Sequence, residues 1–178
     1  ERANDQLNPQ DGLFTLVVRT GNEEKHRVVR SIREVINGPR NLDQLIGVLA
    51  SPDTVLVTLT ITEKGYCLDP TTHEIRWENA DIAWDRDNPE TPRSAPGVLL
   101  AGLRARRDKG LPPFTILSCD NLSENGKQAK AAVTGLARAV DPAFAEWIDA
   151  EVAFPSSMVD RIAPATTRND IDQLEHAT

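Results

Sequence analysis

Three short polar clusters in this sequence carry side chains suited to hydrogen bonding with a small polar molecule. They read TEKGYC at residues 62–67, SCDN at residues 118–121 and PSSMVDR at residues 155–161. The amide of Asn121 is a neutral hydrogen-bond donor. The Glu63 carboxylate can assist proton exchange with water. The Asp160 carboxylate can accept hydrogen bonds, and Arg161 can hold Asp160 in place or contact a carboxylate through two parallel bonds.

Each cluster follows an apolar run that predicts a β-strand, at residues 55–61, 114–117 and 152–154. Helical patterns separate these runs, and alternating strands and helices are typical of right-handed crossovers and a parallel sheet. In such sheets ligands bind beyond the carboxyl ends of the strands. The sequence therefore predicts an α/β fold in which the three clusters gather at one edge of the sheet.

The remaining elements follow from periodicity and capping. Residues 13–19 predict a strand, and 27–36 predict either its hairpin partner or a helix. Asn41 is expected to cap a helix from residue 42, and a Pro- and Asp-rich excursion spans 68–96. Further helices are predicted at 98–107, from Asn125 and near Pro142. The basic run at 104–110 indicates the solvated end of a helix.

Several of these residues have a purely structural alternative. Asn121 can form an Asx-turn at the strand end, and Asp120 is better suited to cap the loop or the next helix than to contact a ligand. Asp160 and Arg161 can form a local ion pair whose sole effect is to order their loop. Glu63 can be a solvated turn residue.

Length, net charge and the cysteine and histidine content limit the classes of partner and site that this chain can have. The chain has 178 residues, the length of one domain, and its net charge of −7 argues against nucleic-acid or anionic-membrane partners. Its two cysteines, Cys67 and Cys119, fit a reducing cytoplasm. The three histidines share no spacing with each other or with the cysteines that would build a metal site.

Five segments, in order, resemble the mannitol dehydrogenase family of long-chain polyol and sugar-acid dehydrogenases. They are PQDGLFTL, TLTITEKGYC, PRSAPG, LSCDNLSENG and FPSSMVDRIAP. The resemblance implies part of a Rossmann-type, mostly parallel sheet with helices on both faces, which binds NAD without a catalytic metal. It makes Asn121 the catalytic donor to the substrate oxygen. It implies substrate contacts from Asp160, Arg161, Glu63 and Lys64, and cofactor contacts from Thr62, Ser118 and Asn121.

The family also implies parts that this sequence does not contain. No GxGxxG turn for the pyrophosphate occurs, and neither does the lysine motif of the family's helical domain, which supplies the general base. We therefore expect residues 1–178 to be a partial nucleotide-binding domain from the middle of a longer enzyme. Alone it should be inactive, bind NAD weakly and self-associate through an unpaired sheet edge. A non-catalytic module that binds a sugar or a partner is the alternative.

The identity of residue 64, a lysine here, helps to choose between two classes of substrate. Family members that act on mannonate or fructuronate often have EKGYC, whereas those that act on mannitol often have glycine at the lysine position. The resemblance therefore favours the pair mannonate and fructuronate over mannitol and fructose.

Overall fold

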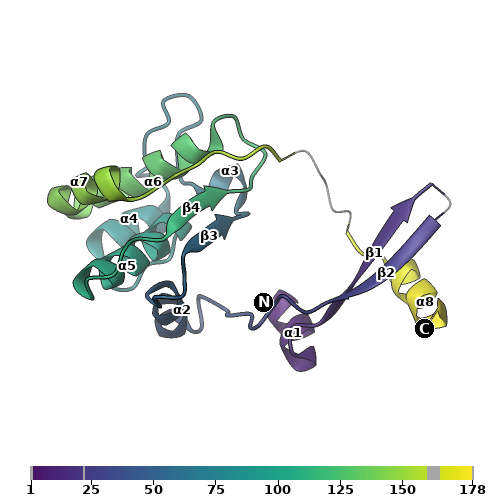
Figure 1. Ribbon diagram of the computed structural model, residues 1–178. Coiled ribbons are helices and arrows are strands. Elements are labelled where there is room, and N and C mark those ends of the chain that lie inside the picture. The colour runs from purple at the N-terminus through teal and green to yellow at the C-terminus, as the bar shows by residue number, and fades with distance from the viewer. Residues whose placement is uncertain (1, 22, 160–164, 178) are drawn as a thin grey trace.

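The computed structural model describes residues 2–21, 23–159 and 165–177. Figure 1 shows a helix-rich unit built around two strands, and on the other side of the molecule a hairpin with the first and last helices. The helices and strands, in chain order, are α1 (Arg2–Leu7), β1 (Phe14–Thr20), β2 (Glu23–Val29), α2 (Leu42–Leu49), β3 (Leu56–Leu59), α3 (Thr62–Gly65), α4 (Ala80–Asp87), α5 (Ala95–Asp108), β4 (Thr115–Ser118), α6 (Asn125–Val140), α7 (Pro142–Glu151) and α8 (Arg168–Ala177).

The two central strands, β3 and β4, are parallel, with Val57 opposite Ile116 and Leu59 opposite Ser118. Because side chains alternate along a strand, these four residues share one face. Ile116 on this face is 0% exposed, whereas Leu56 on the opposite face is 48% exposed. The apolar face of the predicted strand at 55–61 therefore packs into the core, as the alternation indicated.

The chain crosses over between these strands through helices. α4 and α5 connect β3 to β4, and α6 and α7 lead from β4 to residues 152–154. This last segment was predicted as a strand, but it is not a strand in the structure. Its contact with β4 is a backbone hydrogen bond of 3.0 Å from Ile116 N to Ala153 O. The predicted α/β class with a parallel sheet is confirmed.

The core of this unit lies where α5 and α6 pack together and α6 packs on β4. The apolar stripe predicted on the helix after Asn125 is buried at Ala129, Ala132, Val133, Leu136 and Ala137. The helix predicted at 98–107 begins earlier, because the Ser94 hydroxyl accepts the Gly97 N–H at 3.1 Å and Pro96 fits the first turn. α4 was missed inside the excursion, although Asn79 caps it by accepting the Asp81 N–H at 2.9 Å.

The basic run at 104–110 differs from its prediction most clearly at Arg106. Arg106 is 1% exposed, so it is not part of a solvated face. Its guanidinium donates to the carbonyls of Pro112 at 2.6 Å and Leu49 at 3.2 Å, and also to that of Ser51. It thereby joins the end of α5 to the end of α2 and to the segment that enters β4.

The hairpin of β1 and β2 is antiparallel, with Phe14 opposite Val29. The hairpin was predicted, but its second strand covers Glu23–Val29 instead of 27–36. β1 begins at Phe14, so residues after Val29 have no partner in this ladder. The tight turn at Gly21, with φ of 59°, sets this register.

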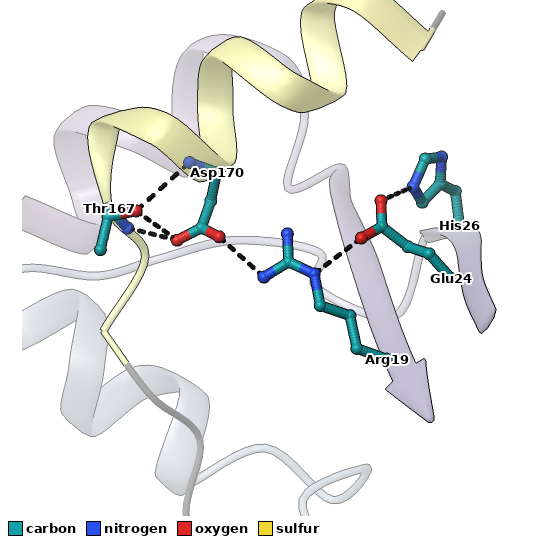
Figure 2. A network of polar contacts seen from close by, with 5 residues as sticks. All are labelled: Arg19, Glu24, His26, Thr167 and Asp170. Carbon is teal, nitrogen blue, oxygen red and sulfur yellow. Dashed lines mark hydrogen bonds and ion pairs between the residues drawn. The ribbon is translucent and has the colours of Figure 1, made fainter. Parts of the chain in front are cut away.

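The helix α8 lies beside the hairpin and is held there by charged side chains, which Figure 2 shows. Arg19 in β1 donates to Asp170 at 2.7 Å and to Glu24 at 2.6 Å. Asp170 also accepts the Thr167 N–H at 2.8 Å, while its own N–H donates to the Thr167 hydroxyl at 3.2 Å. Thr167 and Asp170 therefore form a reciprocal cap at the start of α8, and Arg19 docks this cap on the hairpin.

Candidate functional site

Three loops meet at the carboxyl ends of β3, β4 and the segment 152–154. We name them by their sequences: the TEK loop (residues 60–66), the CDN loop (residues 119–124) and the PSS loop (residues 155–159). The sequence predicted that these clusters would share one edge of the sheet, and hydrogen bonds between all three loops confirm this. The bonds come from four side chains, those of Asp120, Tyr66, Asn125 and Ser157.

Asp120 joins the CDN loop to the TEK loop. Its carboxylate accepts the Thr62 N–H at 2.9 Å through Oδ1 and the Ile61 N–H at 3.1 Å through Oδ2. These two N–H groups stand at the start of α3, where a helix leaves backbone donors without partners. The interpretation of Asp120 as a capping residue is therefore correct, although it caps the loop after the neighbouring strand rather than its own.

Tyr66 supports this contact from the core. Its hydroxyl donates to Asp120 Oδ2 at 2.7 Å and lies 2.6 Å from Ser118 Oγ. Since a carboxylate only accepts, the Ser118 hydroxyl must be the donor to Tyr66. Tyr66 is 1% exposed, and this burial raises the pKa of its phenol, with Asp120 adding to the effect. Tyr66 is therefore a neutral donor at physiological pH.

Asn125 joins the CDN loop to the PSS loop. Its Nδ2 donates to Asp120 O and Ser157 O, both at 3.0 Å, and its Oδ1 accepts the Ser157 N–H at 3.0 Å. The Ser157 hydroxyl in turn donates to Ser118 O at 2.5 Å. Asn125 was expected to cap α6, but Glu124 occupies that position and Asn125 is buried within the loops.

The close approach of these loops also requires a glycine. A Cβ atom at Gly126 would lie 2.5 Å from Phe154 O and 2.6 Å from Pro155 O. Any other residue at this position would push α6 away from the PSS loop.

The predicted site residues of the TEK and CDN loops lie at the surface. Asn121, Thr62, Glu63 and Lys64 are exposed. Within the described part of the chain, the amide of Asn121 forms no hydrogen bond, so the Asx-turn alternative does not describe it. Ser118, predicted to contact the cofactor, is buried, and its hydroxyl is shared between Tyr66 and the Asp120 N–H. Asp160 and Arg161 lie outside the described residues.

Sequence reasoning missed the framework residues Tyr66, Asn125 and Ser157 as parts of the site. Tyr66 and Ser157 belong to the predicted clusters, but the predicted site residues in those clusters were other side chains. The available signal was the presence of hydroxyl side chains next to buried strand ends, where polar groups need partners.

The described residues hold no group of three or more His, Cys, Asp or Glu side chains able to bind a metal ion. None of their helices is long and apolar enough to cross a bilayer. The groups that the site offers to a ligand are the amide, hydroxyl, carboxylate and ammonium groups of these three joined loops.

Residues 1–177 match the mannitol dehydrogenase Rossmann domain family. Mannitol 2-dehydrogenase of Neosartorya fischeri is 44% identical to this chain over 168 residues, which cover 93% of this chain and 34% of that protein. D-mannonate oxidoreductase of Escherichia coli is 40% identical over 171 residues, which cover 96% of this chain and 35% of that protein.

The fold agrees with a solved structure as well. The chain superposes on Pseudomonas fluorescens mannitol 2-dehydrogenase, in its ternary complex with NAD and D-mannitol, with a TM-score of 0.94 and 38% identity. This superposition covers 99% of this chain and 36% of that one. The chain thus spans about a third of the length of the relatives that it matches. By sequence over nearly its whole length and by its Rossmann-type fold, the chain belongs to the mannitol dehydrogenase family.

Proposed function

We propose that this chain is part of an NAD-dependent dehydrogenase that interconverts a secondary alcohol and a ketone on a linear sugar acid or polyol. The observation that carries the proposal is the exposed amide of Asn121, on a loop that hydrogen bonds tie directly to the TEK loop and, through Asn125, to the PSS loop. A donor that is fixed in position and free of partners in the described chain is suited to hydrogen-bond a substrate oxygen.

The residues at this edge fit the carboxamide of a nicotinamide cofactor, because they offer both donors and acceptors. Thr62 carries an exposed hydroxyl and Asn121 an exposed amide. We propose that these two residues contact NAD, and that Ser118 contributes by holding Tyr66 and the CDN loop in place. When bound, NAD would supply the hydride acceptor for the alcohol.

The protein's own groups would orient the substrate and stabilise charge. Asn121 would donate to the oxygen that alternates between alcohol and ketone, favouring the alkoxide form. Glu63, on the neighbouring TEK loop, would exchange protons with water. Asp160 is expected to accept a substrate hydroxyl, and Arg161 to hold Asp160 or to bind a carboxylate.

For the substrate, we propose mannonate and fructuronate ahead of mannitol and fructose. The exposed ammonium of Lys64, next to Glu63 on the TEK loop, favours an anionic sugar acid over a neutral polyol. The relatives do not separate these choices, since one is named for mannitol and another for mannonate at 44% and 40% identity.

We further propose that this chain acts with a glycine-rich turn and a helical domain in the intact protein. The helical domain would provide the general base. Residues 1–178 alone are then expected to show no turnover and weak NAD binding. The proposed compartment is the cytoplasm, in keeping with the two free cysteines Cys67 and Cys119.

The test is a steady-state assay of the intact protein with NAD against mannonate, mannitol and related polyols. Lys64→Met should lower kcat/KM for mannonate about tenfold, as expected for losing one charged hydrogen bond of about 1.5 kcal/mol, and leave mannitol turnover unchanged. Lys109→Met, an exposed lysine at the end of α5, is the matched control. Turnover of mannitol but not mannonate would reverse the substrate order. Sugar binding without any turnover would favour the non-catalytic module.

A further inference from the structure

The TEK loop contains a strained backbone position. Thr62 adopts a φ of 62°, in the left-handed region that β-branched residues rarely occupy. Such strain persists only where the surroundings hold it, and it often marks functional positions. Thr62 directly precedes Glu63, so its conformation sets the direction in which the exposed part of the TEK loop leaves β3.

The carboxylate of Asp120, in the CDN loop, holds Thr62 in this conformation. Both oxygens of Asp120 are engaged, Oδ1 with the Thr62 N–H at 2.9 Å and Oδ2 with the Ile61 N–H at 3.1 Å. The Tyr66 hydroxyl, 2.7 Å from Oδ2, fixes the carboxylate from the buried side. Asp120 therefore cannot rotate without breaking three hydrogen bonds.

This network sits one residue away from each proposed functional side chain. Asp120 directly precedes Asn121, and Thr62 directly precedes Glu63. We infer that Asp120 and Tyr66 are positioning residues of the site, which set the TEK loop relative to Asn121 and act on the reaction only through that geometry. The inference rests on the proposed dehydrogenase function.

The Tyr66 hydroxyl keeps its proton over the pH range of an assay. Burial raises the pKa of the Tyr66 phenol, and the neighbouring Asp120 raises it further. The Tyr66 hydroxyl thus remains protonated and keeps donating at neutral and mildly alkaline pH. A change in the pH profile of a Tyr66 variant would then reflect displaced site residues rather than titration of Tyr66.

The test uses Tyr66→Phe in the intact protein, which removes one hydroxyl and keeps the buried ring. Amide hydrogen exchange at Ile61 and Thr62 should accelerate at least tenfold. The kcat for the sugar should fall about tenfold with an altered pH profile, a larger change than that in the Kd for NAD. Asp120→Asn should produce the same pattern more strongly, because it weakens the acceptor of all three bonds.

The matched control is Thr134→Val, which removes a buried hydroxyl that donates to Lys130 O at 2.7 Å within α6. It should leave the kinetics and the exchange at Ile61 and Thr62 unchanged. Unchanged exchange in Tyr66→Phe would overturn the inference, because the network would then not hold the loop. Faster exchange with wild-type kcat and pH profile would also overturn it, since the role would be structural only.

The same experiments distinguish a failure of the proposed dehydrogenase function from a failure of the positioning inference. A wild-type protein that turns over no polyol or sugar acid would refute the dehydrogenase and, with it, a positioning role in catalysis. The exchange data would still decide whether Asp120 and Tyr66 hold the strained loop.

Discussion

Two asparagines four residues apart should respond to the same substitution in opposite ways. Asn121 is exposed and its amide forms no hydrogen bond within the described chain, whereas Asn125 is 1% exposed and bonds to two loops. Asn121→Ala should therefore impair the reaction without destabilising the fold. Asn125→Ala should destabilise the fold. Each variant is the natural control for the other.

The expected changes in unfolding free energy depend on how many hydrogen-bond partners lose their bond when each side chain is truncated. Truncation of Asn121 leaves no described partner unsatisfied, so the free energy of unfolding should change by less than about 0.5 kcal/mol. Loss of one oxyanion donor should lower kcat about 10²–10³-fold. Truncation of Asn125 leaves Asp120 O, Ser157 O and the Ser157 N–H without their bonds of 3.0 Å. At about 1 kcal/mol for each bond, this should cost about 3 kcal/mol.

The assay combines steady-state kinetics of the intact protein with urea unfolding of both variants. NAD binding should weaken far less than kcat falls in Asn121→Ala, because the main lost interaction is strongest in the transition state. Wild-type turnover in Asn121→Ala would remove Asn121 from the mechanism. Equal losses of stability in both variants would refute the separation of functional and framework residues.

Three other predictions concern the rest of the molecule. Arg106→Met should lower the unfolding free energy by about 3 kcal/mol, because it leaves the carbonyls of Leu49, Ser51 and Pro112 without their charged donor. Arg107→Met on the exposed side should cost less than about 1 kcal/mol, and equal urea midpoints would contradict this. Bonds from Thr167 and then Arg19 hold the pKa of Asp170 below its ordinary value. The docking of α8 should therefore be complete above about pH 4 and weaken as the pH falls below it, as followed by amide exchange in α8 corrected for intrinsic rates. Exchange that is independent of pH after this correction would rule out the Asp170 contact as the cause. Residues 1–178 alone should self-associate in sedimentation experiments, since β3 has an unpaired edge within the described chain and Val57 and Leu59 line an apolar cavity of about 800 Å³. Leu56→Lys should reduce this association, and a monomer at all concentrations would disprove it.

The sequence predicted the parts of the fold that depend on regular burial. The stripe of Ala129, Val133 and Leu136 indicated α6, and the alternation along 55–61 indicated both β3 and its buried face. The meeting of the three loops also followed, because the carboxyl ends of parallel strands share an edge. The resemblance of the five segments to the mannitol dehydrogenase family was confirmed.

Features that depend on three-dimensional partners were not predictable in this way. Arg106 stands in a basic run that is indistinguishable from a solvated helix end, yet carbonyls of Leu49 and Pro112 surround it. α4 was missed because its short, charged sequence lacks a clear apolar stripe, and its cap at Asn79 was its main signal.

The same limit explains why the polar residues after β4 could not be sorted by type. Asp120, Asn121 and Asn125 are all short polar side chains that suit turns, caps and ligands alike. Their roles separate only because the left-handed backbone at Thr62 places two N–H groups within reach of Asp120, and because Gly126 lets the PSS loop come close to Asn125. With Asp120 and Asn125 turned inward by these contacts, Asn121 is the polar side chain of the three that remains exposed. An exposed donor on a loop that its neighbours hold in place is the arrangement on which we base the proposal that Asn121 contacts a ligand.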